Sequence, residues 1–508
     1  MLTYMLVLNI IDTECSLVYN IFITNNNIKK MDNKLKIKEY INDQIAQSNF
    51  RAKAYVFDAQ ENKRPYGDVF LKIESHLKQF LNGNKAYRWI TLTGLRGAGK
   101  TTLMYQLYHL KKEIDAYFLV LSVDEITETL GSNISEVVSV FEEIVGRPIT
   151  NLDKPLFLFL DEVQYDEKWG ASLKSVYDRS QNVFIFSTGS AAALINSNPD
   201  LARRTIYEKI YPLSFTEFIK IKHNQYETKD LATNLKETLF FSNNAKEAYS
   251  KLLKNVAKID NYYLGLSRLD FENYLNYGSL PFMIALDNEA LVYDQINKSL
   301  DRVVNKDISQ MCPLSSEIIS RISAILYAVA DMDALNFTTL SKKFGISRSK
   351  ISEIFSALEK AEVLHRIYPQ GSHFKQVTQK SSKYLFSSPA FRSMYYKTIG
   401  NSISEENSRG KLLEDLVGMY LYRLCDKQPS YSLTYDSAKG GADFILNTNS
   451  ASVVIEVGVN KKEYRQVIKT AEKVKASYSL IISDQQEDLE FSSEFNALKV
   501  QLRYFLLI

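Results

Sequence analysis

The sequence predicts an α/β fold in several domains, built around a parallel sheet, and three observations support this. The chain has 508 residues, more than one hydrophobic core normally supports, so about three domains are expected. Strand-like runs alternate with helix-patterned segments in the first half. The run at residues 156–160 is apolar throughout, as in a buried parallel strand. We predict domains at residues 1–50, 51–218, 219–310, 311–400 and 401–508.

Composition sets limits on compartment and partners. The net charge is only +3 with 24% charged residues, so any nucleic-acid-binding surface must be local. The three cysteines, Cys15, Cys312 and Cys425, are far apart and odd in number. This argues against a disulfide framework and for a reducing compartment, so we expect a cytoplasmic protein.

The first 30 residues allow more than one interpretation. Residues 2–23 are apolar enough to suggest a membrane segment or a signal, but Asp12 and Glu14 interrupt them and no basic residues open the chain. The alternative is an appendage or a mis-called start, with the folded protein beginning near Met31. We favour this second interpretation, which predicts no membrane association.

The segment at residues 94–101, GLRGAGKT, fits the phosphate-binding loop G-x-x-x-x-G-K-[ST]. A strand-like run precedes it and a helix-like run follows, so bound phosphates would lie at a helix N-terminus. Lys100 can reach the β and γ oxygens of ATP, and the Thr101 hydroxyl can bind Mg²⁺. The alternative is a glycine-rich structural turn. The predicted nucleotide-binding residues are Gly94, Leu95, Arg96, Gly97, Ala98, Gly99, Lys100, Thr101 and Thr102.

Two carboxylates follow the apolar run of residues 156–160. Because ligands bind at the carboxyl ends of strands in open α/β sheets, Asp161 can hold Mg²⁺ and Glu162 can orient the attacking water. The alternative is a strand that ends in two solvated acids. A third strand, at residues 183–186, runs into the polar segment Ser187-Thr188-Gly189-Ser190, which either senses the γ-phosphate or forms a turn.

An arginine that approaches the γ-phosphate accelerates hydrolysis strongly, within one subunit or from a neighbour. Arg204, after Arg203, is the candidate, and a solvated surface pair is the alternative. Action on a neighbouring subunit would require a homo-oligomer.

The order of these motifs resembles that in a known family. GLRGAGKT, LFLFLDEVQ, FSTGS, LARR and YPLSFTEF resemble the AAA-type ATPases of bacteria and archaea that join an ATPase core to a winged helix and a restriction-endonuclease-like C-terminal domain. The resemblance covers residues 50 to 508 and implies a P-loop NTPase core. Gln164 and Arg204 match residues of that family, whereas Arg203 replaces a glycine that commonly precedes the arginine.

The middle of the chain predicts a helical connector and a helix-turn-helix. Residues 244–259 and 289–304 have helical patterns, and we interpret residues 219–310 as a helical lid and connector. Residues 338–360 read as helix, turn at Gly345, and second helix, and residues 363–368 as a wing. The expected buried stripe of the second helix is Ile351, Ile354, Phe355 and Leu358.

Bases outnumber acids between Asn336 and Lys383, so this region predicts a local positive face. The bases are Lys342, Lys343, Arg348, Lys350, Lys360, Arg366, Lys375, Lys380 and Lys383. The exposed start of the second helix would contact DNA, with phosphate contacts favoured over base readout. Docking of a protein partner is the alternative.

The last domain carries three acids that resemble a PD-(D/E)xK nuclease core: Glu414, Asp443 and Glu456. Such carboxylates hold Mg²⁺ beside a lysine two residues beyond the last acid. Here that position is Gly458, and the next candidates are Lys461 and Lys462. We favour a vestigial, non-catalytic site, with DNA cleavage as the alternative.

Two classes of function therefore compete. The first is an ATP-hydrolysing switch or motor that uses Lys100, Thr101, Asp161 and Glu162 and contacts DNA or a protein through its C-terminal half. The second is an ATP-regulated, Mg²⁺-dependent nuclease, which Gly458 disfavours. A small-molecule kinase is a weaker third, since no acceptor site is visible.

Overall fold

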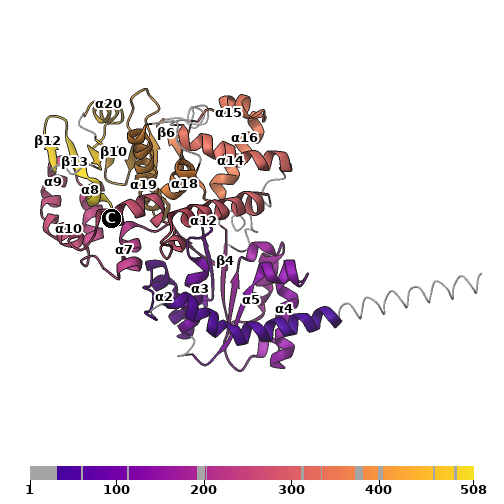
Figure 1. The fold of residues 1–508 in the computed structure, drawn as a ribbon. Coiled ribbons are helices and arrows are strands. Elements are labelled where there is room, and N and C mark those ends of the chain that lie inside the picture. Colours follow the sequence, from indigo (N-terminus) through magenta and orange to yellow (C-terminus); the bar gives the residue numbers. More distant parts are fainter. Residues whose placement is uncertain are drawn as a thin grey trace, which may run out of the picture. The chain divides into compact units, whose positions relative to one another are not determined.

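Two sheets organise the chain in the computed structural model, one in each of two units (Figure 1). The structure describes residues 31–508 except 59–60, 111–113, 191–200, 202, 310–313, 333–334, 372–381, 399–403, 461–463 and 485–488. The first unit ends at Lys209, and the second runs over Ile210–Ile508 and includes the loop Gly94–Gly99. Each unit is described by itself.

The first unit contains a five-stranded sheet in the order β2-β3-β4-β1-β5. Its strands are β1 (Trp89–Gly94), β2 (Tyr117–Ser122), β3 (Leu156–Asp161), β4 (Val183–Gly189) and β5 (Ile206–Ile210). The pairs β2–β3, β3–β4 and β4–β1 are parallel, which confirms the predicted parallel sheet. Since β4 lies between β1 and β3, its carboxyl end is flanked by the phosphate loop and by Asp161.

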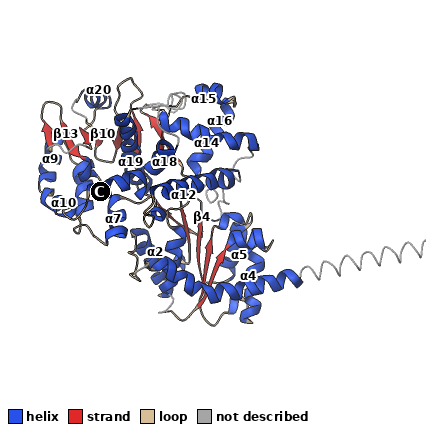
Figure 2. Cartoon of the chain, viewed as in Figure 1, coloured by secondary structure: helices blue, strands red, loops and turns tan. Residues whose placement is uncertain are grey.

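Helices cover this sheet. They are α2 (Asp68–Leu81), α3 (Lys100–His109), α4 (Ile134–Val145) and α5 (Trp169–Arg179). Figure 2 shows the strands between α2 on one side and α4 and α5 on the other. Asn133 caps the start of α4 by accepting from Glu136 N, and Gly146 ends it with a left-handed φ of 72°.

A long helix at residues 31–56 also belongs to the first unit. It buries Ile37, Ile41, Ala52 and Val56, and its Tyr40 hydroxyl accepts a hydrogen bond from Ser122 N at 3.1 Å, at the end of β2. The helix crosses the predicted boundary between residues 50 and 51 without a break. Burial at regular spacing from Ile37 onward packs this helix into the first unit.

The second unit contains an eight-stranded sheet in the order β12-β13-β11-β10-β9-β8-β6-β7. Its strands are β6 (Leu364–Pro369), β7 (Lys383–Phe386), β8 (Ser432–Tyr435), β9 (Phe444–Asn447), β10 (Ser452–Gly458), β11 (Tyr478–Ser483), β12 (Glu490–Ser492) and β13 (Ala497–Gln501). Because β6 pairs with β8 through Tyr368↔Thr434, one sheet spans the predicted boundary at residues 400 and 401.

The helices of the second unit surround this sheet. They are α7 (Phe215–His223), α8 (Leu231–Phe240), α9 (Ala245–Leu253), α10 (Val256–Tyr263), α11 (Arg268–Asn273), α12 (Glu289–Arg302), α14 (Ser316–Asp331), α15 (Phe337–Phe344), α16 (Arg348–Lys360), α18 (Pro389–Thr398), α19 (Glu405–Lys427), α20 (Arg465–Val474) and α21 (Leu502–Phe505). Alternation along β10 separates two faces: Ile455 packs with α19, and Val454 packs with α20.

Helices α8 to α10, which belong to the predicted lid and connector, pack against the C-terminal sheet. Leu235, Leu252 and Ile259 belong to the same hydrophobic cluster as strands β9 to β11 and β13. The Tyr478 hydroxyl on β11 donates to Leu239 O at 2.6 Å. Their apolar stripes therefore cover the C-terminal sheet, a non-local partner that the helical pattern did not reveal.

Helices α14, α15 and α16 precede the antiparallel strands β6 and β7. Gly345 ends α15 with a left-handed φ of 63°, and Ser347 caps α16 by accepting from Lys350 N. Ile351, Ile354, Phe355 and Leu358 are all buried, which confirms the predicted stripe of α16.

No helix among the described residues is long and apolar enough to cross a membrane. The apolar segment at residues 2–23 lies outside the described part of the chain.

Glu217 on α7 provides a test of the helix packing in the second unit. Its carboxylate accepts from Ser214 N in a capping box and from two nitrogens of Arg423, on α19, at 2.8 and 3.0 Å. Burial alone would raise the pKa of Glu217, but the Arg423 charge and these hydrogen bonds outweigh it and lower the pKa to about 2.

We predict that this contribution to stability is lost in acid. Because the folded pKa lies below the ordinary 4.5, the stabilisation is complete above about pH 4.5 and declines as pH falls toward 2. Between pH 6 and pH 3 the advantage of the wild type over Glu217→Gln in urea unfolding should shrink by about 2 kcal/mol. The exposed Glu237→Gln variant, also on a helix of this unit, is the control. A difference that does not change with pH would contradict the assignment.

Candidate functional site

The phosphate-binding loop joins β1 to α3 and depends on three glycines. Gly94, Gly97 and Gly99 have φ angles of 150°, 84° and 100°, which residues with a Cβ rarely adopt. The helix begins at Lys100, so the unpaired N–H groups of its first turn lie at the end of the loop. The strand, loop and helix are therefore arranged as the sequence predicted.

Asp161 lies next to Thr101 at the carboxyl end of β3. The Thr101 Oγ1 hydroxyl donates to Asp161 Oδ2 at 2.7 Å, and the Thr188 hydroxyl at the end of β4 donates to the other oxygen, Oδ1. Desolvation, and then the charge of Glu162, raise the pKa of the Asp161 carboxyl. These oxygens from α3 and β3 thus meet at one point, as expected for neighbouring parallel strands.

Glu162 has an unusual backbone conformation for a residue with a side chain. Its φ of 55° and ψ of 50° are left-handed, and the chain turns there from β3 into a short helical turn, Val163–Tyr165. The Glu162 N–H donates to Thr188 Oγ1 at 3.1 Å. The Gln164 side-chain amide donates to Glu162 Oε2, so the carboxylate has a defined orientation. Such strain is frequent at functional sites.

The polar residues at the end of β4 divide into two environments. Thr188 bridges Asp161 and Glu162, whereas Ser187 is fully buried and contacts Thr91 Oγ1 at 2.8 Å. Thr91 in turn contacts Thr205 Oγ1 at 2.9 Å, on the chain entering β5. Of the two strand-end hydroxyls, only that of Thr188 contacts the acidic pair, and Ser187 belongs to the interior of the sheet.

Sequence reasoning missed an aromatic pair close to these acids. Tyr55, from the helix of residues 31–56, stacks on Tyr105 of α3 with ring centroids 4.8 Å apart. Burial, and then the Asp161 charge, raise the pKa of Tyr55. The sequence does not predict this pair because Tyr55 lies far in sequence from Tyr105. A helical pattern alone does not specify which segment the helix packs against.

Arg204 is not directed to the phosphate loop in this structure. Its Nε and Nη2 donate to Asp178 at 2.9 and 3.1 Å, near the end of α5. The hydrogen bond from Arg204 lowers the pKa of Asp178. Arg203 is exposed. The predicted arginine is therefore held by a carboxylate that the sequence pattern did not identify.

The predicted Mg²⁺ ligands fit that ion. The Thr101 hydroxyl and the Asp161 carboxylate are hard oxygen donors, which Mg²⁺ prefers, and both belong to the rigid ends of α3 and β3. Lys100, the residue before Thr101 and the first residue of α3, is 95% buried.

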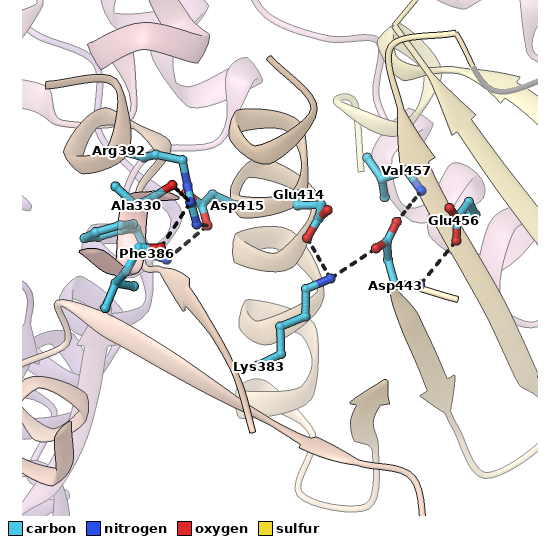
Figure 3. A network of polar contacts seen from close by, with 10 residues as sticks. Ala330, Lys383, Phe386, Arg392, Glu414, Asp415, Asp443, Glu456 and Val457 are labelled. Carbon is cyan, nitrogen blue, oxygen red and sulfur yellow. Dashed lines mark hydrogen bonds and ion pairs between the residues drawn. The ribbon is translucent and has the colours of Figure 1, made fainter. Parts of the chain in front are cut away.

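Two of the three predicted acids of the second unit bind a lysine that the sequence analysis placed on a DNA-binding surface. Lys383, the first residue of β7, has a side chain only 9% exposed. Its Nζ lies 2.6 Å from Glu414 Oε2, on α19, and 3.1 Å from Asp443 Oδ1, just before β9 (Figure 3). Lys383 is thus wrongly counted among the surface bases, because the acids that bind it lie up to 60 residues away.

The remaining acid, Glu456, contacts the backbone of the neighbouring strand. Its Oε2 accepts from Asp443 N at 3.3 Å, while Asp443 Oδ2 accepts from Val457 N at 3.0 Å. Among the described residues, no group of three or more His, Cys, Asp or Glu side chains is arranged to hold a metal ion. Lys461, the predicted fourth member, lies outside the described residues.

The start of α16 is exposed, as the DNA-contact hypothesis requires. Arg348, Ser349 and Ser352 are exposed, whereas Lys350 is half-buried and its Nζ lies 2.6 Å from Glu353. Lys342 and Lys343 on α15 are also exposed. Lys375 and Lys380 of the predicted basic face lie outside the described residues.

Two family models match separate regions of the chain. A model described as an AAA domain matches residues 86–219, and one described as a domain of unknown function (DUF8612) matches residues 268–398. The uncharacterized protein MJ1637 of Methanocaldococcus jannaschii is 34% identical over 484 residues, covering 93% of this chain and 94% of that protein. MJ1544 of the same organism is 22% identical and covers 65% of each chain.

Among solved structures, the Aeropyrum pernix Orc1 protein in complex with DNA matches at a TM-score of 0.28 and 10% identity. The match covers 65% of this chain and 92% of the Orc1 chain, and a TM-score this low supports no inference. The relative at 34% identity, matched over nearly its whole length, is sufficient to assign the family. The chain therefore belongs to the family of the Methanocaldococcus jannaschii protein MJ1637, with an AAA domain over residues 86–219.

Proposed function

We propose that this protein binds ATP with Mg²⁺ and hydrolyses it, as an AAA-type switch or motor whose C-terminal half contacts DNA or a protein partner. The observation that carries the ATPase proposal is the hydrogen bond from Thr101 Oγ1 to Asp161 Oδ2 at 2.7 Å. It joins the first turn of the helix after the phosphate loop to the acidic end of β3. The same two side chains are those that the sequence assigns to Mg²⁺.

The residues around this bond suit phosphate binding. The loop glycines allow backbone N–H groups to face the phosphates, and Lys100 adds a positive charge at the start of α3. When bound, Mg²⁺ would neutralise charge on the phosphate oxygens, with Thr101 and Asp161 as its protein ligands. The hydrogen bond between these two side chains keeps both in place.

Glu162 is the residue that we assign to the attacking water. The left-handed turn at Glu162 separates its side chain from that of Asp161, and Gln164 holds its carboxylate by a hydrogen bond. A carboxylate so oriented can accept a proton from water during attack on the γ-phosphate. Thr188, which contacts both acids, would transmit the state of the γ-phosphate to β4.

Arg204 needs a rearrangement to act as an arginine finger. Both of its hydrogen-bonding contacts to Asp178 would have to break, because the guanidinium is committed to that carboxylate. We propose that a neighbouring subunit or bound nucleotide releases it, in a homo-oligomer or within one chain.

The second unit supports a binding role. Three helices followed by an antiparallel pair of strands, with the start of α16 exposed, support the proposal of a winged helix. We propose that Arg348 and its basic neighbours contact phosphates of DNA, and a protein partner is the other candidate. In the described part of the chain, the acids Glu414 and Asp443 bind Lys383 and backbone groups, which disfavours the nuclease alternative.

We expect Lys100→Ala to abolish Mg²⁺-dependent ATP turnover, because the phosphates would lose their fixed positive charge. Turnover is measured as phosphate release by the purified full chain. Lys229→Ala, which changes an exposed lysine of the second unit, should leave the rate unchanged. Normal turnover in Lys100→Ala would remove the ATPase assignment.

We expect Glu162→Gln to bind ATP but to hydrolyse it at least about 100-fold more slowly, as befits loss of a general base. Binding is measured by calorimetry and hydrolysis by single-turnover phosphate release. Glu167→Gln, which changes an exposed acid shortly after that turn, is the matched control. Loss of ATP binding in Glu162→Gln would instead assign the carboxylate to the nucleotide pocket.

For DNA binding, we expect Arg348→Ala to weaken affinity for duplex DNA equally across sequences. The slope of log affinity against log salt should fall by about 1, as for one lost phosphate contact. Lys360→Ala, at the opposite end of α16, should have little effect. If wild-type protein shows no salt-dependent binding, the winged-helix arrangement serves a protein partner.

A further inference from the structure

We propose that the Lys383 ammonium is the resident cation of the Glu414–Asp443 carboxylate site, where it replaces a divalent metal and fastens strand β7 to α19 and β9. This inference concerns the second unit alone and does not depend on the proposed ATPase activity.

The contacts of Lys383 define the site. Its Nζ lies within 2.6 Å of one carboxylate and 3.1 Å of another, and 91% of its side chain is removed from solvent. Figure 3 shows the lysine between the two acids, which come from different elements. A cation that is this buried and lies between two carboxylates occupies the volume that a metal ion bound by both would need.

Two further carboxylate oxygens of these acids accept hydrogen bonds from backbone groups. Asp443 Oδ2 is bound by Val457 N, and Glu456 Oε2 by Asp443 N, in a reciprocal pair of contacts across β9 and β10. Glu456 also shares its strand face with Val454, which packs under α20, whereas Glu414 comes from α19 on the other face. A metal centre needs several hard oxygens that converge on an open position, and Lys383 occupies the position between Glu414 and Asp443.

Electrostatics keeps the lysine charged. Burial opposes ionisation, but the charges of Asp443 and then Glu414 outweigh it and raise the pKa of Lys383 above its ordinary value. Two acids facing one ammonium leave an excess negative charge. Burial, and then Asp443, accordingly raise the pKa of Glu414. Removal of the ammonium would leave two partly buried acids, 25% and 16% exposed, without their counter-ion, which is destabilising.

The adjacent residue on α19 holds the other end of the same strand. Asp415 accepts from Phe386 N, the last residue of β7, at 3.0 Å, and is paired with Arg392 of α18. Strand β7 is therefore anchored at its first residue by Glu414 and at its last by Asp415. Since β7 pairs with β6 beside the helix-turn-helix, Lys383 joins that segment to the C-terminal sheet.

The test compares the full chain with Lys383→Met, which keeps the apolar stem and removes the charge. In EDTA we expect the thermal midpoint of Lys383→Met to fall by on the order of 5–10 °C. Added Mn²⁺ should then raise it again, because the freed acids can bind the ion, and this rise should disappear in Lys383→Met with Asp443→Asn. Lys439→Met, an exposed lysine of the same unit, should behave as the wild type.

Two results for the wild type would overturn the proposal. One is Mn²⁺ binding by the wild type, measured by calorimetry without ATP, that Asp443→Asn abolishes. The other is Mn²⁺-dependent plasmid cleavage that both Lys383→Met and Asp443→Asn abolish, which would make the lysine part of a nuclease site. Absence of any Mn²⁺ effect on Lys383→Met would also contradict replacement of a metal.

If Lys383→Met does not fold, a double variant tests the proposal. The double variant Lys383→Met with Glu414→Gln removes the ammonium together with one carboxylate, so the charges balance better than in the single variant. We expect it to fold and to melt several degrees above Lys383→Met. If the double variant is no more stable than the single one, Glu414 is not the partner of Lys383 and the proposal is wrong.

Discussion

In the second unit, two adjacent acids of helix α19, Glu414 and Asp415, each form an ion pair with a cationic side chain. The packing around α19 depends on these two pairs. Successive residues on a helix point about 100° apart, so the two carboxylates face different neighbours. Glu414 meets Lys383, and Asp415 meets Arg392, which also donates to Ala330 O at the end of α14. A buried charge without a partner would cost several kcal/mol. The acids therefore determine which strand and which helices can pack on α19.

The first unit solves a similar problem at the carboxyl edge of its sheet. Asp161 is stabilised by hydroxyls from α3 and β4, and the turn at Glu162 directs the second carboxylate elsewhere. Here the polar groups lie at strand ends, where ligands bind in parallel sheets, and not within the helical packing. Hydroxyl groups hydrogen-bond to Asp161 in the first unit, whereas cationic side chains bind Glu414 and Asp415 in the second.

The sequence predicted those features whose chemistry is local. The loop of residues 94–101, the strands ending at Asp161 and Gly189, and the buried stripe of α16 all depend on neighbours within a few residues. It did not predict the partners of Lys383, Arg204 or helices α8 to α10, because ion pairs and helix packing depend on residues far away in the chain. A lysine on a polar surface and a lysine between two acids have the same local pattern. The domain boundaries stay predictions for the same reason.

The contacts of Lys383 show how the acids are neutralised although position 458 is not a lysine. Gly458 ends β10, and the ammonium that contacts the acids comes instead from β7 in the preceding segment. This cation comes from β7, the edge strand of the same sheet, and it ties two parts of the chain together. Strand β6 pairs with β8, and β7 is bound at both ends by α19, so hydrogen bonds and ion pairs set the orientation of α16 relative to the C-terminal sheet. A partner held by α16 would therefore be presented on a rigid support.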